Sequence, residues 1–308
     1  MKIAFLGTPE FALPSLDMLR EHGHTLAVFT QPDRPVGRHA APTPPPTKAY
    51  AQQHGIPVFQ FEKIRLPEGA AALKAFAPDL MVTAAFGQIL SAENLAVPEH
   101  GCINVHGSLL PKYRGAAPIQ WAIINGEAET GVTTMLTDVG MDTGDILLAD
   151  RVTIGENETA GELFKRLSIL GAKTLERTIA ALEAGTLKRI PQDESLATKC
   201  PMLKKEHGKL DFSQTVQAVH DRVRGTNPWP GAYALLGGQP VKLHTTRKTD
   251  PDFGSAPAGT LRGSAKTGLF VRCCDGWLEI AELQLPGKKR MDAKACLAGR
   301  PLEGEVLS

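Results

Sequence analysis

The sequence is poor in cysteine and lacks both a long hydrophobic run and a secretory signal. Its five cysteines are an odd and scattered set, which suits reduced thiols in a cytoplasm better than a disulfide framework. No apolar run approaches the roughly 20 residues that a membrane-spanning helix needs. The segment Met1–Leu6 leads straight into a strand pattern, without the long apolar region of a signal peptide. We therefore expect a cytoplasmic protein with no membrane partner.

Net charge is also nearly absent, at +1, but the charges are unevenly distributed. Residues 186–308 hold 19 Lys and Arg against 13 Asp and Glu, a balance of +6, whereas residues 1–185 hold 15 against 20, a balance of −5. A basic second part hints at a polyanionic partner, although ordinary scatter on a solvated surface is the simpler alternative. Because aromatic residues are scarce in this part, attraction to phosphates rather than base stacking would dominate such binding.

The amino-terminal pattern is strand, turn, helix, strand. A strand over Lys2–Leu6 is followed by the turn Gly7-Thr8-Pro9, a helix over Pro9–Glu21 and a strand over Leu26–Thr30. This order predicts a βαβ unit and hence a parallel sheet. The turn lacks the G-x-G-x-x-G spacing with which a backbone approaches a pyrophosphate, so no NAD or other dinucleotide is expected.

The rest of the chain suggests two domains. Further strands and helices continue the α/β pattern as far as a long amphipathic helix over Ala160–Ala184, which gives a doubly wound, mostly parallel, Rossmann-like sheet. After a weakly patterned stretch, short β-like runs separated by glycine-rich turns predict a small barrel of oligonucleotide-binding (OB) type. We place the first domain at residues 1–188, a linker at 189–206 and the second domain at 207–308.

The chemistry-bearing stretch is the strand Cys102–His106 and the loop that follows it. Asn104 and His106 are two residues apart, so they point to the same face at the carboxyl end of the strand, where ligands of open parallel sheets gather. Two alternatives remain open. Asn104 and His106 could be a loop cap and a satisfied core histidine, or His106 could join His100 and Cys102 in a metal site, although the spacing is not typical of zinc ligands.

Two further segments are candidates for function. The loop Asp138–Asp145 carries three carboxylates, and either it binds calcium, for which its spacing is wrong, or Asp142 pairs with His106. The proline-rich stretch Gln31–Lys48 predicts an extended, exposed loop that carries Arg34 and Arg38, and a loop this long in a compact domain is more often functional than idle.

Several of these motifs resemble the folate-dependent formyltransferases, and most closely the members of that family that act on tRNA. The resemblance covers nearly the whole chain, and its most specific block is GCINVHGSLLPKYRGAAPIQWAI, together with GTPEFA, FTQPDRPVGR, DVGMDTGDI and NPWPGAY. It implies transfer of the formyl group of 10-formyltetrahydrofolate to the α-amino group of methionine on initiator tRNA.

By this resemblance Asn104, His106 and Asp142 are the catalytic residues. Asn104 would donate an N–H to the oxygen of the tetrahedral intermediate, and His106 would donate to the same oxygen or shuttle a proton. Asp142 would orient the imidazole or a relaying water. The implied folate-binding residues are Gln88, Ile89, Leu90, Ser108, Leu109, Leu110, Pro111, Asp138, Val139, Gly140 and Met141.

The resemblance also implies the tRNA contacts. They are Arg38 in the proline-rich loop and the lysines of a basic segment, Lys204, Lys205 and Lys209. Neither a metal nor NAD is implied, and we expect a monomer. Two competing hypotheses remain: a related formyltransferase or hydrolase acting on a small molecule such as an amino sugar nucleotide, and a non-catalytic RNA-binding module.

Overall fold

A computed structural model describes residues 1–35, 41–249 and 251–308, which form two compact units. The first unit comprises Met1–Pro118, Thr130–Val152 and Phe164–Cys200, and the second comprises Ile119–Glu129, Thr153–Leu163 and Pro201–Ser308. The chain therefore enters the second unit three times. Of the predicted linker, residues 189–200 cluster with the first unit and residues 201–206 with the second.

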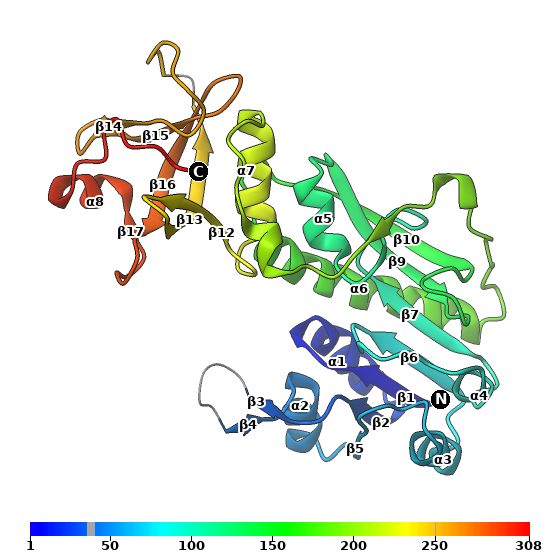
Figure 1. The fold of residues 1–308 in the computed structure, drawn as a ribbon. Coiled ribbons are helices and arrows are strands. Elements are labelled where there is room, and N and C mark those ends of the chain that lie inside the picture. The colour runs from blue at the N-terminus through cyan, green and yellow to red at the C-terminus, as the bar shows by residue number, and fades with distance from the viewer. Residues whose placement is uncertain (36–40, 250) are drawn as a thin grey trace. The chain divides into compact units, whose positions relative to one another are not determined.

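The first unit is built on a seven-stranded sheet of order β10-β9-β7-β6-β1-β2-β5 (Figure 1). Its strands are β1 (Lys2–Gly7), β2 (Thr25–Thr30), β5 (Val58–Gln60), β6 (Leu80–Ala84), β7 (Cys102–His106), β9 (Glu129–Leu136) and β10 (Ile146–Thr153). The pairs from β5 to β7 are parallel, whereas β7 pairs with β9 in the antiparallel sense. The predicted mostly parallel sheet is confirmed.

Helices cover both faces of this sheet. They are α1 (Leu13–Glu21), which follows a 3-10 turn at Glu10–Ala12, α2 (Pro46–Gln53), α3 (Pro67–Phe76), α4 (Ala92–Leu95) and α6 (Ala160–Glu183). On one face Leu6 of β1 and Cys102 of β7 belong to a buried cluster with Leu73 of α3. On the other face Val105 of β7 lies so close to Gly171 of α6 that a Cβ there would be 2.8 Å from its Cγ1. Because side chains alternate along β7, Asn104 and His106 lie on the same face as Cys102, the face covered by α3.

The order of the strands reverses beside β1. The chain runs from β1 outward through β2 to β5, and then returns to the other side of β1 with β6 and β7. In open α/β sheets, ligands bind beyond the carboxyl ends of the strands at such a reversal. The carboxyl ends of β6 and β7 lie next to it, which is where the predicted Asn104 and His106 are placed.

Two predictions about local structure need correction. The sequence pattern predicts a last strand over Asp145–Ala149, whereas β10 runs over Ile146–Thr153; it is an edge strand, and the exposed polar residues in its second half obscure the pattern. The proline-rich segment is not wholly extended loop, since Arg34–Pro35 (β3) and Pro42–Thr43 (β4) pair as a two-stranded ribbon. A second short pair, parallel, joins Arg114–Gly115 (β8) to Lys199–Cys200 (β11).

The second unit contains an antiparallel sheet of order β12-β13-β16-β15-β14, with β17 paired to β16. The strands are β12 (Ala232–Leu236), β13 (Gln239–Lys248), β14 (Leu261–Ser264), β15 (Gly268–Arg272), β16 (Trp277–Gln284) and β17 (Met291–Asp292). Helices α7 (Val216–Gly225) and α8 (Ala293–Gly299) lie in this unit, as does α5 (Pro118–Ile124) from its second residue on, and a 3-10 turn spans Lys205–Gly208.

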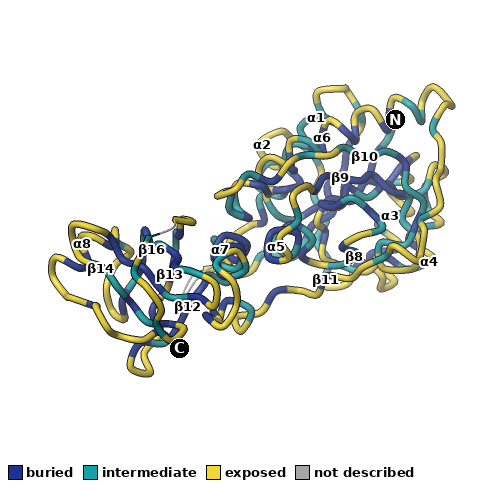
Figure 2. The backbone as a smooth tube through the Cα atoms, turned by 90° about the horizontal axis from the view of Figure 1, so that it is seen from above, coloured by how far each residue is buried: buried dark blue, intermediate teal, exposed yellow. Residues whose placement is uncertain are grey.

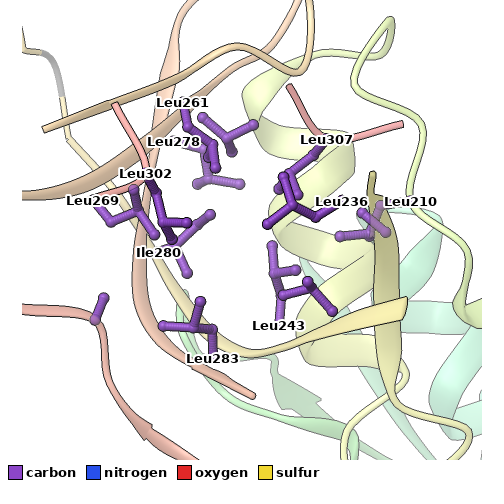
Figure 3. Close-up of a cluster of buried hydrophobic side chains, with 14 of the residues drawn as sticks. Leu210, Leu236, Leu243, Leu261, Leu269, Leu278, Ile280, Leu283, Leu302 and Leu307 are labelled. Atoms are coloured by element: carbon purple, nitrogen blue, oxygen red, sulfur yellow. The ribbon is translucent and has the colours of Figure 1, made fainter. Parts of the chain in front are cut away.

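The last residues of the chain bridge the two edges of this sheet. Leu235 of β12 exchanges backbone hydrogen bonds with Ser308, and Leu307 donates to the carbonyl of Gly259, just before β14. Leucine and isoleucine side chains from the strands β12 to β16 fill the space that the bridged sheet surrounds (Figure 3). Figure 2 shows, for the described residues, that most strands of both units are buried and that many of the turns are exposed.

Candidate active site

Asn104 lies at the carboxyl half of β7, and its amide has a fixed orientation. Thr83 of the neighbouring strand β6 is its register partner, and the Thr83 hydroxyl donates to Asn104 Oδ1 at 2.8 Å. Oδ1 of Asp142 lies 3.4 Å from Nδ2 of Asn104, and because an ionised carboxylate can only accept, this contact identifies the amide nitrogen. The amide therefore presents N–H groups, not its carbonyl, to the Asp142 side of the site.

His106 ends β7 and is only 6% exposed. Its Nε2 lies 2.9 Å from the carbonyl oxygen of Tyr113, an atom that can only accept a hydrogen bond. Nε2 therefore carries a hydrogen, and Nδ1 is the nitrogen free to gain or lose one. Nδ1 faces Asp142, whose Oδ2 is 3.7 Å away.

Asp142 is the third member of this group, and its backbone has φ of +54°. Non-glycine residues rarely adopt this left-handed conformation, so it is held by its surroundings. The backbone N–H of Gly115 donates to Asp142 Oδ2 at 2.8 Å, and the side chain of Gln192 donates to the Asp142 carbonyl at 2.8 Å. The structure thus brings together Asn104, His106 and Asp142, the three residues predicted to be catalytic.

Gly115 is required by its own close contacts. Its φ is +121°, and a Cβ there would lie 2.4 Å from the carbonyl oxygen of Cys200 in β11. A side chain would separate β8 from β11 and move the N–H that Asp142 accepts.

Arg114, Gln192 and Thr83 were missed as supports of the site. Arg114 is 4% exposed although it is charged, and it donates to Gln192 and forms an ion pair with Glu194. The hydrogen bonds from Arg114 lower the pKa of the Glu194 carboxyl. The position of Arg114 within the KYRG block was an available signal, whereas nothing in the sequence around Gln192 connects it to Asp142.

The residues expected to bind folate differ in what their side chains do. The hydroxyl of Ser108 donates to the carbonyl of Lys112, and the amide of Gln88 donates to the carbonyl of Phe61 and accepts from the N–H of Ile64, so both hold loops in place. Leu90 and Leu110 are buried, and Leu109 and Pro111 are partly so. Ile89, Val139 and Met141 are large apolar side chains that are 68%, 74% and 67% exposed. Asp138 accepts from Gly140 N and Thr143 Oγ1, which closes its own loop.

The metal alternatives find no support in the described side chains. Burial raises the pKa of the Cys102 thiol to about 12, and a thiol that does not ionise is a poor metal ligand. Among residues 1–35, 41–249 and 251–308, no three His, Cys, Asp or Glu side chains form a group that could hold a metal ion. Within the same ranges no helix is both long and apolar enough to span a membrane.

The predicted tRNA contacts fall in two places. Lys204, Lys205 and Lys209 are exposed at and around the 3-10 turn Lys205–Gly208 of the second unit. The turn is held by Trp121, whose indole N–H donates to the carbonyl of Pro201 at 2.8 Å and whose ring meets His207 edge to face. Arg38 lies outside the described residues.

Comparison with known proteins agrees with this arrangement. Residues 1–179 match the family model described as formyl transferase, and residues 202–301 match that of the formyl transferase C-terminal domain. The chain is 49% identical over 312 residues to a methionyl-tRNA formyltransferase of Ruminiclostridium cellulolyticum, which covers 100% of this chain and 99% of the relative. It is 50% identical over 304 residues to that of Geobacter metallireducens, covering 98% and 97%.

Solved structures share the fold at lower identity. An N-formyltransferase from Helicobacter canadensis, in complex with folinic acid and dTDP-3-aminofucose, is similar with a TM-score of 0.70 at 20% identity, over 94% of this chain and 100% of that one. HypX from Aquifex aeolicus, in complex with tetrahydrofolic acid, is similar with a TM-score of 0.65 at 17% identity, over 99% of this chain and 48% of that one. By both of its domains, the chain belongs to the formyl transferase family.

Proposed function

We propose that this protein transfers the formyl group of 10-formyltetrahydrofolate to the α-amino group of methionine on initiator tRNA. The observation that carries this proposal is the identity of about half of all residues, along essentially the whole chain, to methionyl-tRNA formyltransferases. The likeness to sugar formyltransferases is confined to the fold at about 20% identity, and it does not favour a sugar nucleotide as acceptor.

The reaction forms one C–N bond and breaks another. The neutral amine of methionine attacks the formyl carbon, and a tetrahedral intermediate with negative charge on oxygen results. The bond between the formyl carbon and the folate nitrogen then breaks, and the proton lost by the amine passes to that nitrogen. The enzyme must therefore stabilise an oxyanion and move one proton.

Asn104 is suited to the first task. One hydrogen of Nδ2 is directed to Asp142, which leaves the other for the formyl oxygen. The amide donates without any change of protonation, and the Asp142 carboxylate, which can only accept, keeps Nδ2 rather than Oδ1 on this side while Oδ1 accepts from Thr83.

His106 is suited to the second task. Because Nε2 donates to the Tyr113 carbonyl, Nδ1 is the atom that accepts the proton of the amine and returns it to the folate nitrogen. Asp142 Oδ2, 3.7 Å away, faces the charge that the ring then carries. Buried between these partners, the ring has one orientation only.

The proposed folate subsite comprises the two loops that follow β6 and β9. The exposed apolar side chains of Ile89, Val139 and Met141 support this, because exposed side chains of this size in neighbouring loops are typical of a binding surface. Leu109, Leu110, Pro111 and the backbone of the loops complete the proposed subsite, while Ser108 and Gln88 act by fixing the loops.

The second domain is the proposed tRNA-binding part. Its sheet, bridged at both edges by the last residues of the chain, supports an OB-like barrel, and its exposed Lys204, Lys205 and Lys209 suit a phosphate backbone. The division into residues 1–188, 189–206 and 207–308, a monomeric state and a cytoplasmic location belong to the same proposal.

A direct test is incubation with 10-formyltetrahydrofolate and charged initiator tRNA, followed by mass analysis of the aminoacyl group. We expect a gain corresponding to one formyl group on methionine. A parallel reaction with an amino sugar nucleotide should yield no product. Formylation of the sugar but not of the tRNA would replace the proposal with the small-molecule alternative.

A further inference from the structure

We infer that Gln192 is a positioning residue, which sets the orientation of the Asp142 carboxylate toward Asn104 and His106. The inference rests on the proposed function, in which Asp142 faces the reacting groups. Gln192 lies after α6, in a segment that carries no chemistry of its own. Its positioning role follows from the hydrogen bonds of its side chain.

The bonds that close the loop around Asp142 run from Gly140 and Thr143 to Asp138, and they do not involve Asp142 itself. Val139 and Met141 are largely exposed, and the backbone of Asp142 has the left-handed φ of +54°. An L-residue in this conformation is disfavoured by about 1–2 kcal/mol. Asp142 therefore needs partners outside the loop to keep it there.

Gln192 is such a partner, because it donates both of its amide hydrogens to this loop. Nε2 donates to the carbonyl of Asp142 at 2.8 Å and to that of Gly144 at 2.7 Å. The two carbonyls flank the left-handed residue on its carboxyl side. Their capture by one amide fixes the peptide planes that follow Asp142.

Arg114 in turn fixes Gln192. Its Nε and Nη2 donate to Gln192 Oε1 at 3.0 and 2.9 Å, so the amide cannot flip and offer its oxygen to the two carbonyls. The guanidinium is buried and forms a two-pronged pair with the carboxylate of Glu194, with contacts of 2.9 and 2.6 Å. Every hydrogen-bonding atom of the Gln192 side chain is thereby used.

The same short strand holds the carboxylate of Asp142. Gly115, next to Arg114 in β8, donates its N–H to Asp142 Oδ2. A closed ring thus runs from the Asp142 carboxylate through Gly115, Arg114 and Gln192 back to the Asp142 carbonyl. This ring fixes both ends of the residue whose Oδ1 and Oδ2 face Asn104 and His106.

The variant Gln192→Glu tests the inference, because it keeps the shape and the acceptor for Arg114 but turns two N–H donors into an oxygen that repels both carbonyls. We expect kcat for formyl transfer to fall by about 10- to 100-fold, the cost of misplacing a reacting group by a fraction of a bond length, with KM for both substrates within about twofold. Gln192→Met, which has neither donors nor charge, serves if the glutamate variant does not fold.

The matched control is Asp193→Ala. Asp193 follows Gln192 in the chain and caps the turn Glu194–Leu196, its carboxylate accepting from the N–H and hydroxyl of Ser195 rather than from Gln192 or Asp142. It loosens the same segment without altering the ring, and kcat should stay within about twofold. An equal loss in this control would mean that only the stability of the segment matters and would overturn the inference.

A double-mutant cycle separates positioning from a general structural role. If Gln192 acts through Asp142, then Gln192→Glu should reduce kcat no further in an Asp142→Asn background. A full additional loss there, or a single variant with kcat within about twofold of the parent, would refute the inference. Failure of the parent protein itself to formylate tRNA would instead refute the proposed function, so the two failures are distinguishable.

Discussion

Single atoms at the end of β7 decide the proposed chemistry. Replacement of Asn104 by Ala removes the N–H that would meet the oxyanion, and we expect kcat to fall by about 10²- to 10³-fold. Replacement of His106 by Ala removes the proton carrier, with a loss of about 10²- to 10⁴-fold. Single-turnover kinetics with charged initiator tRNA measures both effects.

Binding of tRNA provides the contrast for these two variants. Neither side chain belongs to the proposed phosphate contacts, so the affinity for tRNA in a filter-binding assay should stay within about twofold of the parent. Near-normal turnover in either variant would defeat the mechanism, and a parallel loss of affinity would show that the variants had disturbed more than the site.

A second prediction at the residue scale concerns the backbone conformation of Gly115. Gly115→Ala places a Cβ 2.4 Å from the Cys200 carbonyl at a φ of +121°, and we expect a loss of more than about 2 kcal/mol in unfolding free energy together with a loss of formyl transfer. Gly185→Ala is the control, since φ there is +66° but nothing lies within 4 Å of the new Cβ. Urea denaturation compares them, and equal costs would mean that the contact with Cys200 is unimportant.

At the scale of elements, helix α7 and strand β13 enclose a histidine that should make the second domain sensitive to acid. His220 is 1% exposed, its Nε2 meets the Glu156 carbonyl, and its Nδ1 meets the Thr246 hydroxyl. Burial lowers the pKa of His220; the hydrogen bond to the Glu156 carbonyl and the charge of Asp221 oppose this shift, whereas Arg224 and Lys248 add to it.

The sign of this effect follows from the unfolded chain. An unfolded histidine takes up a proton near pH 6.5, before the buried one does, so stability is complete above that pH and declines below it. Between the unfolded and folded pKa values the decline approaches about 1.4 kcal/mol per pH unit. Urea unfolding at pH 7.5 and pH 5.5 measures it.

The variant His220→Gln should make this decline shallower. Glutamine keeps an N–H for the Glu156 carbonyl but does not titrate. The remaining decline has a source in the same unit, because burial also lowers the pKa of His244. Exposed His54, in the first unit, is the control, and His54→Gln should leave the decline unchanged. An undiminished decline in the His220 variant would assign the acid sensitivity elsewhere.

Elements were predictable from the sequence where periodicity is strong and one side of the element is buried. The parallel strands β1, β6 and β7 and the long helix α6 satisfy this condition, and so does the placement of Asn104 and His106 on one face. The edge strand β10 does not, since its polar outward face obscured its length.

The supports of the site lay beyond sequence reasoning for a different reason. Gln192 and Arg114 act through bonds that join segments 78 residues apart, and neither helical nor strand periodicity carries information on such a pairing. Thr83 could be found only from the register of β6 against β7. Local pattern thus placed Asn104 and His106 together at the end of one strand, and the resemblance to formyltransferases gave their proposed roles, but neither identified the groups that orient them.

Across the whole molecule, the uneven charge distribution makes the last prediction. The exposed lysines 204, 205 and 209 belong to the basic part of the chain, and each one that neutralises a tRNA phosphate releases a counterion. Changing any one of Lys204, Lys205 or Lys209 to Gln should weaken tRNA binding and reduce the magnitude of the slope of log K against log salt by about one.

The control is Lys173 of α6, which is exposed and carries the same charge in the acidic part of the chain. The variant Lys173→Gln should leave the slope unchanged. Filter binding over a salt series measures these slopes. A slope that is equal in all four variants would mean that the tRNA does not bind at Lys204, Lys205 and Lys209. The mass assay on methionine would remain an independent test of the reaction.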